Sequence, residues 1–491
     1  MFEEHKEKFS QKMSEFTFTV ETEEINLPME ERVERIKTGK NDDGLMLLFY
    51  NFGRYLFLSS NLNGDLPANL QGKWNRQVKP EWGSDYHFNI NLQMNYWLAE
   101  PLGMGESVEK LINLIESFVP HGEKAAKDLY NCRGIWLPHA GDVWGRATPE
   151  SYGYGVWIGA AGWLAQHIWH RYIYSGDVEF LENRAYPYFK KVAQFYEDYS
   201  FKDSDGIYQL SPSQSPENAF LGAGPFYVSC CKSSAMDVQI AYDALGYAIK
   251  AAEILGVDKE EREIWKSIRN NLPEFKIGSD GRLLEWNEEF VEKEPQHRHV
   301  SHLYGLYPSD LFTLEKRPEQ FYAAKKSLDF RMEQGGGHTG WSRAWVACLY
   351  SRLGEGEKMY EHIYKMICEF ATSSLLDTHP LPFPDQPLIF QIDGNFGAVA
   401  AMTEGVAQYK NNKLYLLPAL PKRWKNGEVK GYRTPGGHTV SFKWEEETIT
   451  QLNIEIGVKE ELCIVLNGEE RQIHGALGES ITFENNHGGA I

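Results

Sequence analysis

Apolar residues recur at helical spacing along most of this chain, from about residue 45 to residue 408. Positions three and four apart share one face of a helix, so this pattern predicts amphipathic helices. The predicted helices cover residues 45–58, 90–102, 108–118, 159–174, 178–199, 235–255, 264–272, 319–332, 342–353, 358–370 and 397–409. Long loops rich in Trp, Gly and Pro join them, and loops of that length usually carry function. Repetition of this kind predicts helical hairpins closed into a toroid.

The hydrophobic period changes from helical to alternating after Lys413. Alternating positions with turn signals at Pro435–Gly437 and Asn467–Gly468 predict a small antiparallel β domain that covers one end of the helical body. Residues 1–40 are polar and predict a linker with some strand and a helix near 29–37. The expected organisation is therefore mainly α, with a linker over 1–40, a helical domain over 41–412 and a β domain over 413–491.

Composition narrows the classes of ligand. The 491 residues include 50 basic and 69 acidic side chains, a net charge of −19, which argues against nucleic-acid and anionic-membrane partners and favours a neutral substrate. A soluble protein that uses charge only for solubility fits equally well. No apolar run reaches the length of a membrane span, and the charged start lacks the apolar region of a signal peptide, so we expect a cytoplasmic protein.

Six scattered cysteines show no CxxC spacing, so they predict reduced, mostly buried thiols rather than disulfides or a zinc site. The histidines of the stretch HRHVSH have no Cys nearby and no H-E-x-x-H pattern. The glycines of GGGHTGWSRAW lack the Lys and the order of a phosphate loop, and no dinucleotide fingerprint occurs. We therefore expect neither a metal nor a cofactor.

The segment 69–97 is rich in asparagine and tryptophan. Amides donate and accept hydrogen bonds, and an indole offers a flat apolar face to a sugar ring. Asn89 and Asn91 lie in this segment, as do Trp74, Trp82 and Trp97. The combination favours a carbohydrate ligand.

Two acidic residues stand in contexts that suit catalysis. Glu217 lies in SPSQSPENAF, a loop stiffened by proline, where partial desolvation would raise the pKa of a general acid. A solvated loop charge or a helix cap is the simpler interpretation. Asp393 lies in FQIDGNFG, just before a predicted helix, where it is either an N-cap or a carboxylate aimed into a cleft to activate water.

Seven stretches together resemble glycoside hydrolase family 95, the inverting α-L-fucosidases. They are LPANLQGKWN, WGSDYHFNINLQMNYW, SPSQSPEN, HRHVSHLYGLYP, HTGWSRAW, QIDGNFG and LLPALPKRW, which follow the family's order over about residues 30–445. The resemblance implies an (α/α)6 barrel with a carboxy-terminal β domain. It also implies removal of terminal α-L-fucose, with α-1,2 linkage to galactose expected at the family level.

The resemblance also implies roles for particular residues. Glu217 matches the general acid, and Asp393 matches the aspartate of the water-activating group, with which the asparagines at Asn89 and Asn91 act. An amide oxygen can hold and polarise a water, while the aspartate supplies negative charge and receives the proton. This explains amides where a second catalytic carboxylate is normally expected.

Further positions match the fucose contacts. His87, Arg298 and His299 correspond to sugar-binding residues, and histidine at position 87 goes with fucose rather than L-galactose. Asp142 and Trp157 also correspond, although the loop around them departs from the family pattern.

The chain also lacks the large amino-terminal β-sandwich of the family. We therefore expect an exposed apolar patch near residues 1–60, or a homo-oligomer that covers it. The rival functions are an α-L-galactosidase on the same scaffold and a catalytically silent glycan-binding protein.

Overall fold

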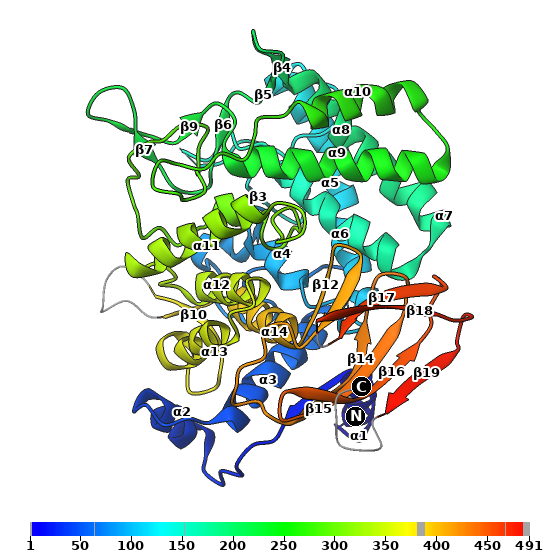
Figure 1. The fold of residues 1–491 in the computed structure, drawn as a ribbon. Helices are drawn as coiled ribbons and strands as arrows, with labels where there is room; N and C mark the ends of the chain where they lie inside the picture. The colour runs from blue at the N-terminus through cyan, green and yellow to red at the C-terminus, as the bar shows by residue number, and fades with distance from the viewer. Residues whose placement is uncertain (1, 63, 152, 381–387, 467, 485–491) are drawn as a thin grey trace.

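The computed structural model describes residues 2–62, 64–151, 153–380, 388–466 and 468–484. It is mainly helical, with its longer strands gathered at one end beside both termini (Figure 1). The helices are α1 Phe2–Ser14, α2 Met29–Lys37, α3 Asp43–Asn61, α4 Asn91–Tyr96, α5 Val108–Tyr130, α6 Ala160–Ser175, α7 Val178–Phe180, α8 Tyr186–Tyr199, α9 Ala235–Leu255, α10 Lys259–Asn270, α11 Pro318–Glu333, α12 Gly340–Arg352, α13 Gly356–Lys365 and α14 Ile392–Val406.

The helices form an (α/α)6 barrel, as the periodicity and the family resemblance predict. Helix α14 packs against α3, α4 and α12, while α6 links α4 to α9. Helix α14 approaches α12 and α4 closely, which requires a small residue at position 397. A Cβ on Gly397 would lie 2.8 Å from the Cβ of Ala344 and 2.7 Å from the sulfur of Met94. The barrel centre is therefore tightly packed around the start of α14, where Asp393 lies.

Short strands tie the barrel loops together. They are β2 Tyr86–His87 with β3 Ala140–Gly141, β4 Phe201–Lys202 with β5 Tyr208–Gln209, β6 Ser213–Gln214 with β9 Cys230–Cys231, β7 Phe220–Leu221 with β8 Tyr227–Val228, and β10 Thr378–His379 with β11 Ile389–Phe390. The pairs β2–β3 and β6–β9 fix the segments that carry His87 and Glu217.

The carboxy-terminal domain contains two sheets. One has the order β1-β14-β15-β16-β19 and the other β12-β13-β17-β18. The strands are β1 Thr17–Val20, β12 Ala407–Lys410, β13 Lys413–Leu416, β14 Gly427–Arg433, β15 Thr439–Glu445, β16 Thr448–Glu455, β17 Glu461–Leu466, β18 Glu469–His474 and β19 Ser480–Glu484. Neighbouring strands are antiparallel except β13 and β17, which are parallel. Strand β1 comes from the segment expected to be a linker.

An aromatic cluster anchors β1 in the β domain. Phe18 stacks on Trp444 at 6.4 Å and meets Trp424 edge-on at 5.4 Å. The predicted turn at Pro435–Gly437 connects β14 to β15, whereas Asn467 of the other predicted turn lies outside the described residues. All six cysteines are free, but only Cys132 and Cys348 are buried, so the expectation of mostly buried thiols is wrong.

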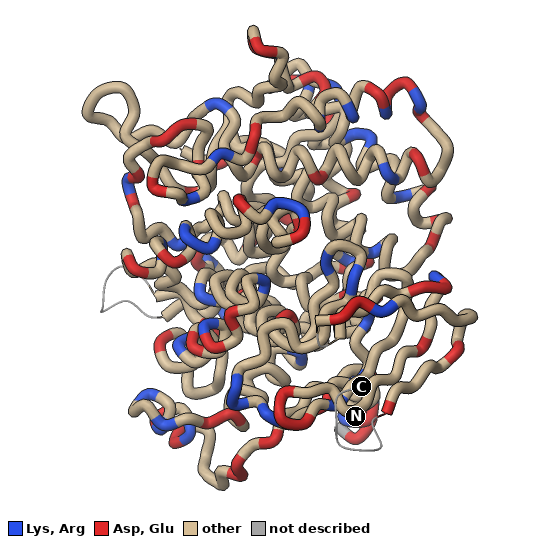
Figure 2. Tube along the Cα trace, viewed as in Figure 1, with Lys and Arg blue, Asp and Glu red and all other residues tan. Residues whose placement is uncertain are grey.

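The surface carries both acidic and basic side chains, together with some exposed apolar side chains. Acidic and basic residues alternate over the same helices and loops (Figure 2). None of the described helices is both long and apolar enough to cross a membrane. Within residues 1–60, Leu27, Leu48 and Tyr55 are each more than one third exposed. The apolar patch or oligomer contact near residues 1–60 stays a prediction.

Candidate active site

The loop that carries Glu217 is held by a buried ion pair. Ser215 Oγ donates to Glu285 Oε1 at 2.8 Å, and Asn218 Nδ2 donates to Glu285 Oε2 at 3.3 Å. Glu285 in turn lies 3.0 Å from Arg331, and both are almost fully buried. A buried pair of this kind fixes geometry because losing either partner leaves an uncompensated charge. Glu217 is therefore presented by a rigid loop.

Three side chains contact the Glu217 carboxylate. Asn89 Nδ2 donates to Oε1 at 3.0 Å, Arg298 Nη2 donates to Oε2 at 2.6 Å, and His299 Nε2 lies 3.4 Å from Oε2. The Glu217 side chain is only 12% exposed. It is neither a freely solvated loop charge nor a helix cap, and Arg298 and His299, the expected fucose contacts, lie beside its carboxylate.

These contacts reverse the expected shift of the Glu217 pKa. Burial alone would raise the pKa, but His299, Arg298 and the amide of Asn89 outweigh burial and hold the pKa well below its ordinary value. Burial lowers the pKa of His299 itself, so Arg298 is the permanent cation beside the carboxylate. The expectation that desolvation dominates at Glu217 is wrong, because sequence could not show the guanidinium beside it.

Asp393 is the second residue of α14 and is fully buried. The N-cap position belongs to Gln391, so Asp393 is not the cap. Asn91 Nδ2 donates to Asp393 Oδ2, and the backbone amide of Gly394 donates to Oδ1 at 2.9 Å. Burial raises the pKa of Asp393 to about 7, against the lowering effect of these hydrogen bonds and of His87.

The two asparagines therefore serve different carboxylates. Asn89 contacts Glu217, whereas Asn91 contacts Asp393. The structure brings together side chains that are 128 and 302 positions apart along the chain. The predicted grouping of four residues is present, but only Asn91 pairs with Asp393.

His87 lies at the end of β2, beside this cluster. Its Nδ1 lies 2.5 Å from Asp85 Oδ1, and its side chain is 18% exposed. Burial by itself would lower the pKa of His87. The hydrogen bond and charge of Asp85, together with the charges of Glu217 and Asp393, outweigh burial and raise this pKa. His87 is thus a partly accessible hydrogen-bond donor that both carboxylates influence.

Two expected sugar contacts have other partners. Asp142 accepts hydrogen bonds from the backbone of Trp144 and from Arg146 Nε, which closes a local turn. Trp157 is 0% exposed, and its carbonyl accepts from Trp136 Nε1 at 3.1 Å. A fully buried indole cannot stack on a sugar, so in this structure Trp157 supports the barrel wall.

The remaining histidines of HRHVSH are structural. His297 Nδ1 accepts from the backbone amide of His299 at 3.0 Å, and His302 lies 3.8 Å from Glu285. Across the described ranges, no group of three or more His, Cys, Asp or Glu side chains is arranged to hold a metal ion.

Asp377 is a buried acid that the sequence did not single out. It is 0% exposed, and neither carboxylate oxygen has a side-chain or backbone donor at hydrogen-bond geometry among the residues that the structure describes. A Cβ on Gly340 or Gly394 would lie 2.0 Å from one of these oxygens, so both glycines make room for the carboxyl group. Burial and the charge of Asp393 raise the pKa of Asp377 well above its ordinary value. No local motif marks this residue.

Two carboxylates, one presented by a loop and one by the first turn of α14, are typical of glycoside hydrolases that use an acid and a base. The chain belongs to glycosyl hydrolase family 95: the family's catalytic-domain model matches residues 1–406, and its carboxy-terminal-domain model matches residues 408–490.

Named relatives agree with this family. The chain is 38% identical over 443 residues to "Alpha-L-fucosidase 2" of Arabidopsis thaliana, covering 86% of this chain and 51% of the relative. It is 29% identical over 430 residues to "Probable alpha-fucosidase A" of Aspergillus niger, covering 82% of this chain and 52% of the relative. The chain thus spans about half the length of the curated relatives it matches.

A solved structure supports the fold. The α-L-rhamnosidase from Dictyoglumus thermophilum superposes with a TM-score of 0.51 at 14% identity, covering 91% of this chain and 45% of the rhamnosidase. At that identity the similarity concerns architecture alone.

Proposed function

We propose that the protein is an inverting α-L-fucosidase in which Glu217 is the general acid and Asp393, through Asn91, activates the attacking water. The observation that carries the proposal is the pair of amides two residues apart, each hydrogen-bonded to a different carboxylate. Glu217 and Asp393 are thereby both hydrogen-bonded to side chains of one short backbone segment.

The family resemblance implies inversion, and the amide contacts are compatible with it. Two residues of chain span at most about 7 Å, and each amide is hydrogen-bonded to its own carboxylate. A retaining enzyme needs its carboxyl groups about 5–5.5 Å apart, whereas an inverting enzyme needs about 6.5–9.5 Å to admit a water. The reach of the segment and its two side chains allows the longer separation that a water needs.

The chemistry follows from these contacts. The Asn91 amide donates to Asp393, which leaves its carbonyl oxygen free to accept from a water. That water's oxygen attacks the anomeric carbon while the glycosidic bond breaks, and the proton of Glu217 goes to the departing oxygen. The proton lost by the water goes to Asp393, so the reaction ends with Glu217 ionised and Asp393 protonated.

The reaction needs the proton on Glu217, but in the free protein Asp393 holds it. With the pKa of Glu217 well below its ordinary value and that of Asp393 about 7, a single proton on the pair resides mainly on Asp393. The reactive form carries the same total charge with the proton on Glu217. If hydroxyl groups of the bound substrate accept hydrogen bonds from Arg298, the contact between Arg298 and Glu217 weakens. The pKa of Glu217 then rises, and the proton moves towards Glu217.

The substrate assignment rests on the named relatives and on His87. Both relatives bear fucosidase names, and His87 is partly exposed beside the two carboxylates. We propose terminal α-L-fucose, α-1,2-linked to galactose, as the substrate.

Two measurements test the proposal. Proton NMR of the first product should show the β-anomer of L-fucose, whereas the α-anomer would refute inversion. Paired assays on α-L-fucosides and α-L-galactosides should favour the fucoside, with partial cross-activity because one pocket substituent is worth only about 1–3 kcal/mol. Faster cleavage of the galactoside would assign an α-L-galactosidase, and binding of fucosylated glycan without turnover would assign a glycan-binding protein.

A further inference from the structure

A second cavity, of about 430 Å³, lies at the far end of the two helices that carry catalytic residues. Helix α4 begins at Asn91 and ends beside Tyr96 and Trp97, which line this cavity. Helix α14 carries Asp393 in its first turn and Glu404, also in the cavity wall, 11 residues later. Eleven residues of helix span about 16 Å. The cavity is therefore separate from the candidate active site.

The acidic side chains in this cavity wall already have partners. Glu100 lies 3.6 Å from Arg171, Asp310 lies 2.9 Å from Lys316, and Glu404 lies 2.7 Å from Arg352. Asp243 accepts from the hydroxyls of Tyr304 and Ser309. Burial raises the pKa of Glu100 to about 7 and that of Asp243 to about 6, which further reduces negative charge in the cavity.

Four cations in the same wall have no carboxylate within ion-pair distance among the described residues: Lys250, Arg269, Arg317 and Lys410. Arg269 lies 3.7 Å above the ring of Tyr242 and donates through Nε to its carbonyl. Arg317 donates to the Tyr242 hydroxyl at 3.3 Å and to a backbone carbonyl. Stacking and backbone contacts hold both guanidinium groups in place, and neither contact neutralises them.

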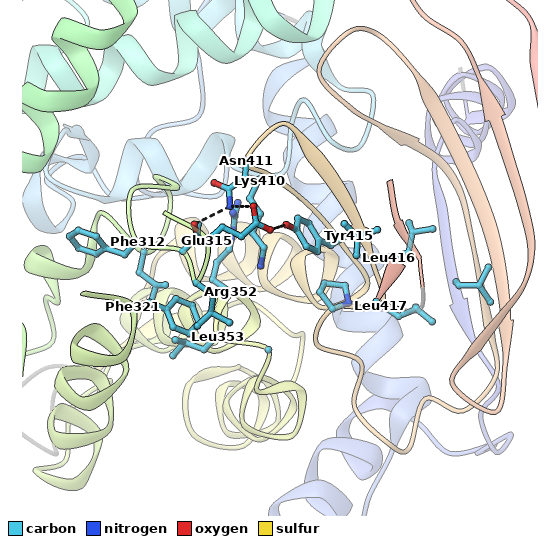
Figure 3. Close-up of a pocket in the computed structure, with 18 of the residues that line it drawn as sticks. Phe312, Glu315, Phe321, Arg352, Leu353, Lys410, Asn411, Tyr415, Leu416 and Leu417 are labelled. Atoms are coloured by element: carbon cyan, nitrogen blue, oxygen red, sulfur yellow. Dashed lines mark hydrogen bonds between the residues drawn. The ribbon is translucent and has the colours of Figure 1, made fainter. Parts of the chain in front are cut away.

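The two lysines border the cavity on different sides. Lys250 Nζ lies 5.7 Å above the ring of Trp169, which stacks on Tyr247. Lys410 belongs to the hairpin β12–β13, and burial lowers its pKa to about 8. Figure 3 shows Lys410 and Arg352 from the neighbouring pocket, where Asn411 at the hairpin turn is hydrogen-bonded to Glu315. Lys410 therefore lies between this cavity and the neighbouring pocket, and it lines both of them.

An excess of unpaired cations is unusual in a chain with a net charge of −19. Such a cavity attracts anions, and guanidinium groups with free N–H edges suit carboxylate or phosphate oxygens. The volume falls within the range of small-molecule sites, and the aromatic faces of Trp169 and Tyr247 suit a ring with apolar C–H surface.

We propose that this cavity is a second binding site, for a sugar-sized anion that carries a carboxylate or a phosphate group. The proposal is independent of the fucosidase reaction, because it rests on a different set of residues at the opposite end of α4 and α14.

Isothermal titration of the full chain with four probes tests the proposal: glucose 6-phosphate, glucuronate, inorganic phosphate and glucose. At low ionic strength we expect at least one charged sugar to bind more tightly than about 1 mM, and glucose not to bind measurably. Added salt should weaken the binding. Comparison of the two charged sugars identifies the preferred anionic group. Absence of binding by both, or equal binding of glucose, would overturn the proposal, as would inorganic phosphate binding as tightly as the better sugar.

Variants locate the binding. Lys250→Ala and Arg317→Gln should each weaken binding of the charged sugar about tenfold, which corresponds to about 1.4 kcal/mol. Lys266→Ala, which removes an exposed ion-paired cation on α10, is the matched control and should bind as wild type does. Lys250 is exposed, so its truncation should leave folding intact even if the Arg317 variant is unstable. Unchanged affinity in Lys250→Ala and in a folded Arg317→Gln would place the ligand elsewhere and refute the site.

Discussion

Asn91 donates its side-chain amide to the carboxylate of Asp393, which follows it by 302 positions. Two residues earlier, Asn89 donates in the same way to Glu217. One short segment at the start of α4 thus fixes both candidate catalytic carboxylates. This arrangement leads to predictions about protonation, leaving groups and packing.

Asp393 should destabilise the folded protein at neutral and higher pH. Its pKa is about 7 in the fold and about 3.9 when unfolded. The folded state therefore binds more protons between these values, and the free energy of unfolding falls as pH rises through that window. Asp393→Asn should be more stable than wild type at about pH 8, by on the order of a few kcal/mol, and equally stable at about pH 4. Urea unfolding at both pH values measures the difference; an equal gain at both would contradict the assigned cause.

The same substitution should change the pH dependence of activity. The wild-type reactive form holds one proton on the carboxylate pair, so kcat/KM should fall as pH rises through about 7. In Asp393→Asn only Glu217 remains, with a pKa well below its ordinary value. The alkaline limb of the residual activity should therefore move to lower pH. Asp142→Asn is the matched control, because Asp142 closes a local turn, and it should leave the limb unchanged.

Glu217→Gln should reveal the general acid through its dependence on the leaving group. Turnover of a natural fucoside should fall about 10²–10⁴-fold, since no proton reaches the departing oxygen. An activated substrate such as fucosyl fluoride needs little protonation and should lose much less. Measured kcat values for both substrates, with Glu106→Gln as an exposed control, make the comparison. Equal losses on the two substrates would remove Glu217 from the acid role.

Gly394 and Asp377 should be coupled through space. A Cβ on Gly394 would lie 2.0 Å from an Asp377 oxygen, so Gly394→Ala should cost about 1–3 kcal/mol or more of stability and displace Asp393. Asp377→Ala removes the obstructing carboxyl and should restore part of that loss in the double variant. A double-mutant cycle on the free energy of unfolding measures this coupling, and additive effects would show that the two groups do not touch.

Much of the fold was predictable because its helices are amphipathic. The predicted range 29–37 coincides with α2, where burial of one face, at Val33 and Ile36, sets a helical period that local sequence records. The predicted range 235–255 coincides with α9, which is buried on most sides. The pairing of β1 with β14 was not predictable, because strand pairing across 407 to 413 positions leaves no local signal. The asparagines and tryptophans of segment 69–97 suggested a carbohydrate ligand, and the ordered motifs indicated the family.

The sequence by itself determined the helical body, the family and the identity of the acidic and amide side chains that form the site. Only the tertiary structure decided which amide serves which carboxylate, that Trp157 is buried, and that Asp377 lies beside Asp393. It also decided the direction of the Glu217 pKa shift. The physical reason is that hydrogen bonds, desolvation and charge act over a few ångströms, and residues so close in space are hundreds of positions apart along the chain.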